Sequence, residues 1–307
     1  MKNNSPKRII VLGIMRSGTS LTAELVHLWG AYAGAKEELW KWDPSDPRGY
    51  GYMEYIPLQN MNDDLLDHNE AVPPSLEHLE EKASNPIYRD KALELIHEMD
   101  ERASASGAIA WVWKDARTVL TLPFWTKILK DPIYVITVRH PIETTLSAAR
   151  TEEMDEESIP FSAGLIYWQY CMLTMLNYTQ DNPRKTFIVY DQLLDKPTQE
   201  CTRLGNFLDE HCGLSEQGSQ KRIETMLPQI STKERHYHSQ KSLAEMEQAT
   251  REQRMLYNFL RVKTLYPHEP FNKNDFALYP GWKEYLQTMD MLMSMSQAQN
   301  ETAKGHE

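Results

Sequence analysis

Two glycines and three hydroxyl residues are packed into the segment GIMRSGTS, which runs from Gly13 to Ser20. Gly13 and Gly18 stand between an apolar run that predicts a strand and a segment, Leu21–Val26, that predicts a helix. In such a turn glycines let the backbone approach a ligand, and the N–H groups of Ser17 to Ser20 face an anion at the helix N-terminus. The hydroxyls of Thr19 and Ser20 add donors and can cap the helix. The segment therefore predicts a loop that binds phosphate.

The cations around this loop do not fit a magnesium-dependent triphosphatase. Thr19 occupies the position where such a loop has its lysine, and the only cation in the loop is Arg16. A triphosphatase also needs a magnesium-binding aspartate at the end of another strand. Two other predicted strands instead end in Lys114 and Arg139. We therefore predict a metal-free site for a ligand that carries more than one phosphate group.

Four short apolar runs predict the strands that position these side chains. They are Ile9–Ile14, Ile109–Trp113, Ile133–Val138 and Thr186–Tyr190, and helical periodicity appears between them at Asp90–Ala103 and Ser162–Tyr178. Alternating strands and helices predict an α/β fold with a central parallel sheet and helices on both faces. Ligands of such sheets bind at the carboxyl ends of the strands, which places the loop and the two strand-end cations around one site.

The composition argues against a membrane protein and against a nucleic-acid-binding protein. The chain has 307 residues, 41% of them hydrophobic, and no apolar run approaches the roughly 18 residues of a membrane span. A net charge of −11 argues against a nucleic-acid partner, and three cysteines without metal spacing suit a reducing compartment. We expect a cytoplasmic protein with no membrane partner, built as one domain over residues 1–299. We expect an inserted lid over about residues 36–85 and a disordered tail at 300–307.

Several segments together resemble the sulfotransferases that use 3′-phosphoadenosine 5′-phosphosulfate (PAPS). They are VLGIMRSGTSLTAELV, WVWKDARTVLTLPFW, YVITVRHPIETTLSAAR, the helix around Trp168 and FIVYDQLLDKP, and their order is similar to that of the bacterial branch of the family. The resemblance implies a three-layer P-loop-like fold and PAPS as the sulfuryl donor, with no metal. It implies that the first loop holds the 5′-phosphosulfate. Arg139 and Ser147, an arginine and a serine at the family's spacing, would hold the 3′-phosphate.

The resemblance also assigns cations to the reacting group. Arg16 stands where the family has a lysine or arginine that neutralises the leaving phosphate oxygen. Lys114 lies in a segment similar to the family's KxPR and becomes a candidate for the sulfuryl oxygens. The segment departs from the family at Ala116, which occupies the usual proline position. Tyr190 and Arg235 are further candidates for contact with the donor nucleotide.

Three carboxylates are candidates for the general base that the acceptor hydroxyl needs. Glu37 and Glu38 lie in GAKEE, which resembles the tyrosylprotein branch of the family, and we favour them slightly. Glu54 lies in DPRGYGYME, which resembles a GYFE segment of the bacterial branch.

We therefore predict a sulfotransferase that moves a sulfuryl group from PAPS to a hydroxyl acceptor by in-line displacement. An acidic protein favours a small molecule or neutral carbohydrate as acceptor over a polyanion, and peptidyl tyrosine stays open. The alternatives are a P-loop small-molecule kinase and a catalytically silent nucleotide-binding protein.

Overall fold

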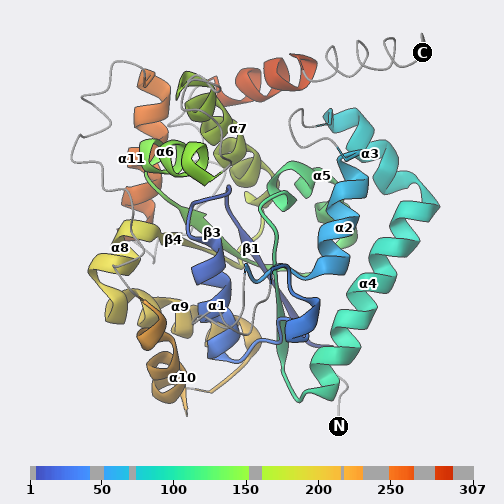
Figure 1. The fold of residues 1–307 in the computed structure, drawn as a ribbon, viewed down its shortest axis with the longest axis vertical. Coiled ribbons are helices and arrows are strands. Elements are labelled where there is room, and N and C mark those ends of the chain that lie inside the picture. Colours follow the sequence, from blue (N-terminus) through green and yellow to red (C-terminus); the bar gives the residue numbers. More distant parts are fainter. Residues whose placement is uncertain are drawn as a thin grey trace.

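A computed structural model describes residues 5–41, 52–68, 74–151, 161–215, 218–230, 249–265 and 281–292 of the chain. Its centre is a parallel sheet of four strands in the order β2-β1-β3-β4 (Figure 1). The strands are β1 (Lys7–Leu12), β2 (Ala110–Lys114), β3 (Ile133–Val138) and β4 (Lys185–Val189). The predicted α/β class with a parallel sheet is confirmed.

The strands differ from their predicted bounds by one or two residues, except β3, whose bounds are those predicted. The first strand ends at Leu12 because the chain leaves the sheet at Gly13 to form the loop. Nearly every strand residue is buried, including all six of β3. Burial on both faces explains why the strands read as continuous apolar runs rather than as alternating patterns.

Helices cover both faces of the sheet (Figure 1). On one side α1 packs against α10, and α10 against α9, whereas on the other α5 packs against α7 and α3. Together they make the three layers of the predicted fold. The helices are α1 (Thr19–Trp29), α2 (Ile56–Leu65), α3 (Leu76–Ser84), α4 (Pro86–Ala105), α5 (Thr118–Ile128), α6 (Pro141–Thr151), α7 (Phe161–Thr179), α8 (Tyr190–Asp195), α9 (Pro197–Cys212), α10 (Ser219–Met226) and α11 (Arg251–Leu265), with short 3-10 turns η1 (Lys36–Glu38) and η2 (Leu227–Gln229).

The described parts of the predicted lid are largely helical rather than irregular. Pro57 stands in the first turn of α2, where a missing N–H costs nothing, and the Ser75 hydroxyl caps α3 by accepting from the His78 N–H. Pro57 therefore marks a helix start rather than a break in the chain. Whether this region is an insertion in a single domain stays a prediction, and the tail at 300–307 lies outside the described residues.

Within the described part of the chain, no helix combines the length and the apolar character that crossing a bilayer requires.

Candidate active site

The glycine-containing loop joins β1 to α1 at the carboxyl edge of the sheet. Gly18 is the residue that caps α1, with φ 93° and ψ 16°, and no side chain bonds to the first turn. The prediction that Thr19 or Ser20 caps this helix is therefore wrong, because the helix already begins at Thr19. With no side-chain cap, the first N–H groups of α1 are directed out of the helix, and its dipole favours an anion there. Phosphate binding by this loop stays a prediction, and the start of α1 is compatible with it.

Both loop glycines are required by close packing. A Cβ at Gly13 would lie 1.9 Å from Thr137 Oγ1, and a Cβ at Gly18 would lie 2.4 Å from Tyr190 Cδ2. The residues that press on the loop come from β3 and from the start of α8, so the neighbouring strands fix its shape. Tyr190, predicted to contact the nucleotide, lies directly against the loop backbone.

Ser17 shapes the loop from within. Its hydroxyl donates to the Ile14 carbonyl at 2.7 Å and shares a 2.8 Å hydrogen bond with Thr137 Oγ1, and its side chain is buried. Its N–H donates to the Ile14 carbonyl at 3.2 Å. These bonds occupy the N–H of Ser17, one of the four that the sequence assigned to a ligand. The remaining N–H groups, from Gly18 to Ser20, are the ones left to bind an anion.

The two predicted phosphate-binding elements meet each other directly. Arg16, with φ 64°, places Nε 3.1 Å from the hydroxyl of Ser147 on α6, and Arg139 donates from its guanidinium to the Arg16 carbonyl at 2.9 Å. These contacts span more than 120 residues of sequence. Arg139 and Ser147 are both buried, at 6% and 5% exposure. The sequence-predicted group Arg16, Arg139 and Ser147 therefore forms one cluster.

Two further residues hold Arg139 in this cluster. The ring of Tyr190 lies against the Arg139 guanidinium, with 4.7 Å between the ring centroid and Cζ. The buried carboxylate of Glu143, which lies on α6 four residues after Arg139, accepts a hydrogen bond from the guanidinium at 3.4 Å. Glu143 was not among the site residues predicted from the sequence. Its signal was the arginine–glutamate spacing of four residues across the start of a helix.

A second group of polar side chains surrounds the end of β2. Lys114 is 4% exposed and donates to the Glu54 carboxylate at 2.5 Å and to the Tyr52 carbonyl at 3.2 Å. Burial raises the pKa of Glu54 above its ordinary value, and the Lys114 ammonium opposes that rise. Gln59 of α2 donates to the other oxygen of Glu54 at 3.3 Å. A carboxylate with a raised pKa and a fixed orientation is suited to take up a proton.

The other candidate bases lie apart from this pair. Glu37 is exposed on η1, and Glu38 accepts a 2.5 Å hydrogen bond from Arg102 of α4. Of the three carboxylates, the structure brings only Glu54 to Lys114. Arg235, the remaining predicted contact of the nucleotide, lies outside the described residues.

The sheet order places the Lys114–Glu54 pair and the Arg139 cluster on either side of the loop. Lys114 pairs in register with Val11 of β1, two residues before Gly13, and Arg139 follows the end of β3 on the opposite side of β1. Tyr190 follows the end of β4, the next strand. The carboxyl edge therefore presents a cation, the glycine-containing loop, a second cation and an aromatic ring in a row. Among the described residues no group of three or more His, Cys, Asp or Glu side chains is arranged to hold a metal ion.

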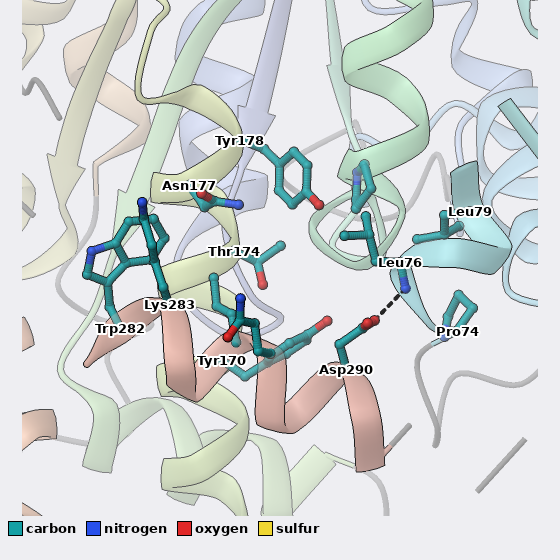
Figure 2. Close-up of a pocket in the computed structure, with 13 residues that line it drawn as sticks. Pro74, Leu76, Leu79, Tyr170, Thr174, Asn177, Tyr178, Trp282, Lys283 and Asp290 are labelled. Atoms are coloured by element: carbon teal, nitrogen blue, oxygen red, sulfur yellow. Dashed lines mark hydrogen bonds between the residues drawn. The ribbon is translucent and has the colours of Figure 1, made fainter. Parts of the chain in front are cut away.

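A separate cavity of about 220 Å³ lies away from these residues (Figure 2). It is lined by α3, α5, α7 and the helical residues 282–292, and Figure 2 shows Asp290 bonded to the backbone N–H of Leu76 at its rim. None of the residues of the loop, of the Arg139 cluster or of the Lys114 pair contributes to its walls.

Comparison with known proteins gives a family match over most of the chain. The profile of the Sulfotransferase family matches residues 6–212. No curated protein matches the chain significantly.

The solved structures that are similar to this chain share little of its sequence. They include the sulfotransferase domain of the Synechococcus PCC 7002 olefin synthase (17% identity, TM-score 0.45, 97% of each chain) and the sulfotransferase domain of the curacin biosynthetic pathway (16% identity, TM-score 0.42, 95% of this chain and 98% of that one). Sulfotransferase STF9 from Mycobacterium avium has 16% identity and a TM-score of 0.42 over 93% of this chain and 77% of that one.

Proposed function

The chain belongs to the sulfotransferase family, and on that premise we propose that it moves a sulfuryl group from PAPS to the hydroxyl of an acceptor. The donor supplies the sulfuryl group on its 5′-phosphate and carries a second phosphate at the 3′ position. The residues at the carboxyl edge of the sheet fit both groups. The loop and the N-terminus of α1 suit the 5′-phosphosulfate, and Arg139 with Ser147 suits the 3′-phosphate.

One observation carries this proposal: the two anion-binding elements touch. Arg16 of the loop bonds to Ser147, and Arg139 bonds to the carbonyl of Arg16. A nucleotide with phosphate on both the 3′ and the 5′ oxygen presents two anions that are only a few bonds apart. Two adjoining sites therefore match a bisphosphorylated nucleoside better than a nucleoside triphosphate, whose phosphates extend from one end of the ribose.

The side chains have distinct tasks in the transfer. Glu54 takes the proton of the acceptor hydroxyl as that oxygen forms its bond to sulfur. The phosphate oxygen of the donor leaves with the electron pair of the broken S–O bond, and Arg16 offsets its charge. Lys114 offsets charge on the sulfuryl oxygens. Preorganised charges of this type act where charge develops and need little rearrangement during the reaction.

We favour Glu54 over Glu37 and Glu38 as the base because it adjoins Lys114 and its side chain is only 12% exposed. The acceptor proposed from composition is a small molecule or neutral sugar. Peptidyl tyrosine stays open.

The first test measures nucleotide binding by calorimetry in EDTA. We expect the chain to bind adenosine 3′,5′-bisphosphate (PAP) at least about tenfold more tightly than AMP, because each charge-assisted bond to the 3′-phosphate contributes about 1.5–3 kcal/mol. Ser147→Ala should weaken PAP binding more than AMP binding, because Ser147 is proposed to contact the 3′-phosphate that AMP lacks. Ser104→Ala is the control, since the Ser104 hydroxyl, on an exposed side chain far from the loop, bonds among the described residues only within its own helix, α4. Tighter binding of ATP–Mg than of PAP would favour the kinase alternative and contradict the proposal.

The second test measures turnover of PAPS with a library of hydroxyl acceptors, with and without EDTA. Sulfuryl transfer that survives EDTA supports the proposed enzyme. Tight PAP binding without transfer to any member of a broad library would instead support a silent nucleotide-binding protein.

A further inference from the structure

A buried amide connects α2 to the turn that follows β2. Asn62 is fully buried, and its Nδ2 donates to the Asp115 carboxylate at 2.8 Å and to the Thr118 hydroxyl at 3.1 Å. Its Oδ1 accepts from Thr121 Oγ1 and from Trp125 Nε1, both at 2.8 Å. All of the bonds reach across 53 to 63 residues of sequence. An amide with both donors and its acceptor used has one orientation, so α2 and α5 are held in one alignment.

The residue that Asn62 holds, Asp115, shapes the turn. Its second carboxylate oxygen accepts from the backbone N–H and from Nε of Arg117, both at 3.0 Å. A carboxylate that bonds to the backbone two residues ahead forms an Asx turn. Ala116 stands in the middle of this turn and does not fix its own φ as proline would. The hydrogen bonds from Asn62 through Asp115 to Arg117 therefore supply the rigidity that the sequence lacks at Ala116.

Lys114 precedes Asp115 directly, so the direction of its side chain depends on this turn. Two of the three N–H bonds of its ammonium go to Glu54 and to the Tyr52 carbonyl. Among the described residues nothing accepts from the third. Lys114 is buried and cannot move far to reach an anion. The position of its ammonium is therefore set by the backbone. A displacement of 1 Å in a catalytic group can reduce the reaction rate about a hundredfold.

We propose that Asn62 is a positioning residue, which fixes Asp115 and thereby directs Lys114 at the sulfuryl group of the donor. The inference rests on the proposed function and adds to it a residue of α2 that touches neither donor nor acceptor. It also explains why a chain without the proline of the family pattern keeps a defined strand exit.

The test compares the binding of PAPS with that of PAP, which lacks the sulfuryl group. No acceptor is needed, because Lys114 is proposed to contact the donor itself. Asn62→Asp removes both amide donors and keeps an acceptor for Thr121 and Trp125. Asp115→Asn breaks the same hydrogen bond from the other side. We expect each to weaken PAPS binding about tenfold, the loss of one charge-assisted hydrogen bond, while PAP binding changes less than about twofold.

The double variant Asn62→Asp/Asp115→Asn exchanges donor and acceptor and should restore PAPS affinity to within about threefold of the wild-type value. Thr121→Val is the control for a purely structural effect. It removes one bond to Asn62 without touching Asp115, so it should lower the melting temperature and leave the preference for PAPS over PAP unchanged.

The outcomes separate this inference from the proposed function. Absence of PAP binding by the wild-type chain contradicts the proposed function. Normal PAP binding with an unchanged preference for PAPS in both single variants, or no preference in the wild type, overturns the positioning role alone. Equal loss of that preference in Thr121→Val overturns it as well. If neither single variant folds while the exchange variant does, the pair serves stability and the positioning role is wrong.

Discussion

At the residue scale, the site contains two buried cations, each held against a carboxylate. Lys114 pairs with Glu54 and Arg139 with Glu143. Burying a charge is expensive unless it is paired, and removing one partner leaves the other uncompensated. These carboxylates therefore allow the cations to be present before any anion binds. In the proposed function, a bound phosphosulfate would add negative charge to a site that is already assembled.

The choice of general base can be decided by two matched substitutions. Glu54→Gln should reduce kcat by about 10²–10⁴-fold, because it removes proton uptake but keeps the shape of the side chain. Glu38→Gln should leave kcat unchanged, since Glu38 bonds to Arg102 at the protein surface. Steady-state rates with an acceptor found in the screen give the comparison. The reverse result, with Glu38 needed and Glu54 dispensable, would exclude Glu54 as the base.

The pH dependence follows from the raised pKa of Glu54. The base must be ionised, so kcat should rise with pH through that raised pKa, and this acidic limb should be absent from any residual rate of Glu54→Gln.

The raised pKa of Glu54 also affects stability, which should fall rather than rise as pH increases through it. A carboxyl whose pKa is higher when folded than when unfolded stabilises the chain at low pH and loses that contribution as pH rises through the folded value. Thermal unfolding from pH 4 upward, with Glu54→Gln as reference, measures it.

At the scale of elements, the loop between β1 and α1 is shaped by its neighbours as much as by its own sequence. Gly18 adopts a left-handed conformation, and the ring of Tyr190 occupies the space that a side chain would need. Tyr190 in turn lies against Arg139. One aromatic ring therefore links the loop between β1 and α1 to Arg139.

Two glycine substitutions separate backbone strain from this contact. Gly107 also has a positive φ of 78°, but a Cβ there would meet nothing within 4 Å. Gly107→Ala should cost about 1 kcal/mol of strain and leave PAP binding unchanged. Gly18→Ala should cost more, about 1–3 kcal/mol, and weaken PAP binding as well, because Tyr190 must move. Denaturant unfolding and calorimetry measure both effects. Equal costs, with PAP binding retained in both variants, would show that Tyr190 moves without consequence.

At the scale of the whole molecule, one hydrophobic core extends from the sheet into both helix layers and includes the three cysteines. Cys171 lies on α7, and Cys201 and Cys212 lie on α9, on the other side of the sheet. All three are free and buried. Burial raises their pKa values, to about 12 for Cys171, about 11 for Cys201 and about 12 for Cys212. These thiols are structural side chains and poor nucleophiles.

Thiol labelling should therefore report unfolding of the whole fold. In native buffer at pH 8 we expect negligible reaction with a thiol reagent, and reaction of all three cysteines after denaturation. The labelling rates of the two helix layers should rise together with denaturant. Early reaction of α9 alone would show that this layer opens independently of the sheet.

Local patterns in the sequence determined the fold class, the position of the glycine-containing loop and the two cations at the strand ends. Continuous apolar runs mark strands buried on both faces, and the glycine spacing marks the turn between β1 and α1. The resemblance to the sulfotransferase family indicated Arg139 and Ser147, which both belong to one strand–helix unit. Each of these features is encoded within about twenty residues, where backbone geometry fixes which side chains share an edge.

Only the tertiary structure decided which carboxylate meets Lys114, where the donors of Ser17 go, and that Asn62 holds the turn after β2. Glu54 and Lys114 are 60 residues apart, Ser17 and Thr137 are 120 apart, and Asn62 and Asp115 are 53 apart. Prolines between residues 36 and 85 suggested an irregular lid, whereas α2 packs against α5 and brings Gln59 and Asn62 to the site. A hydrogen bond between distant residues depends on how helices and strands pack, and packing is a property of the whole core that no local pattern contains.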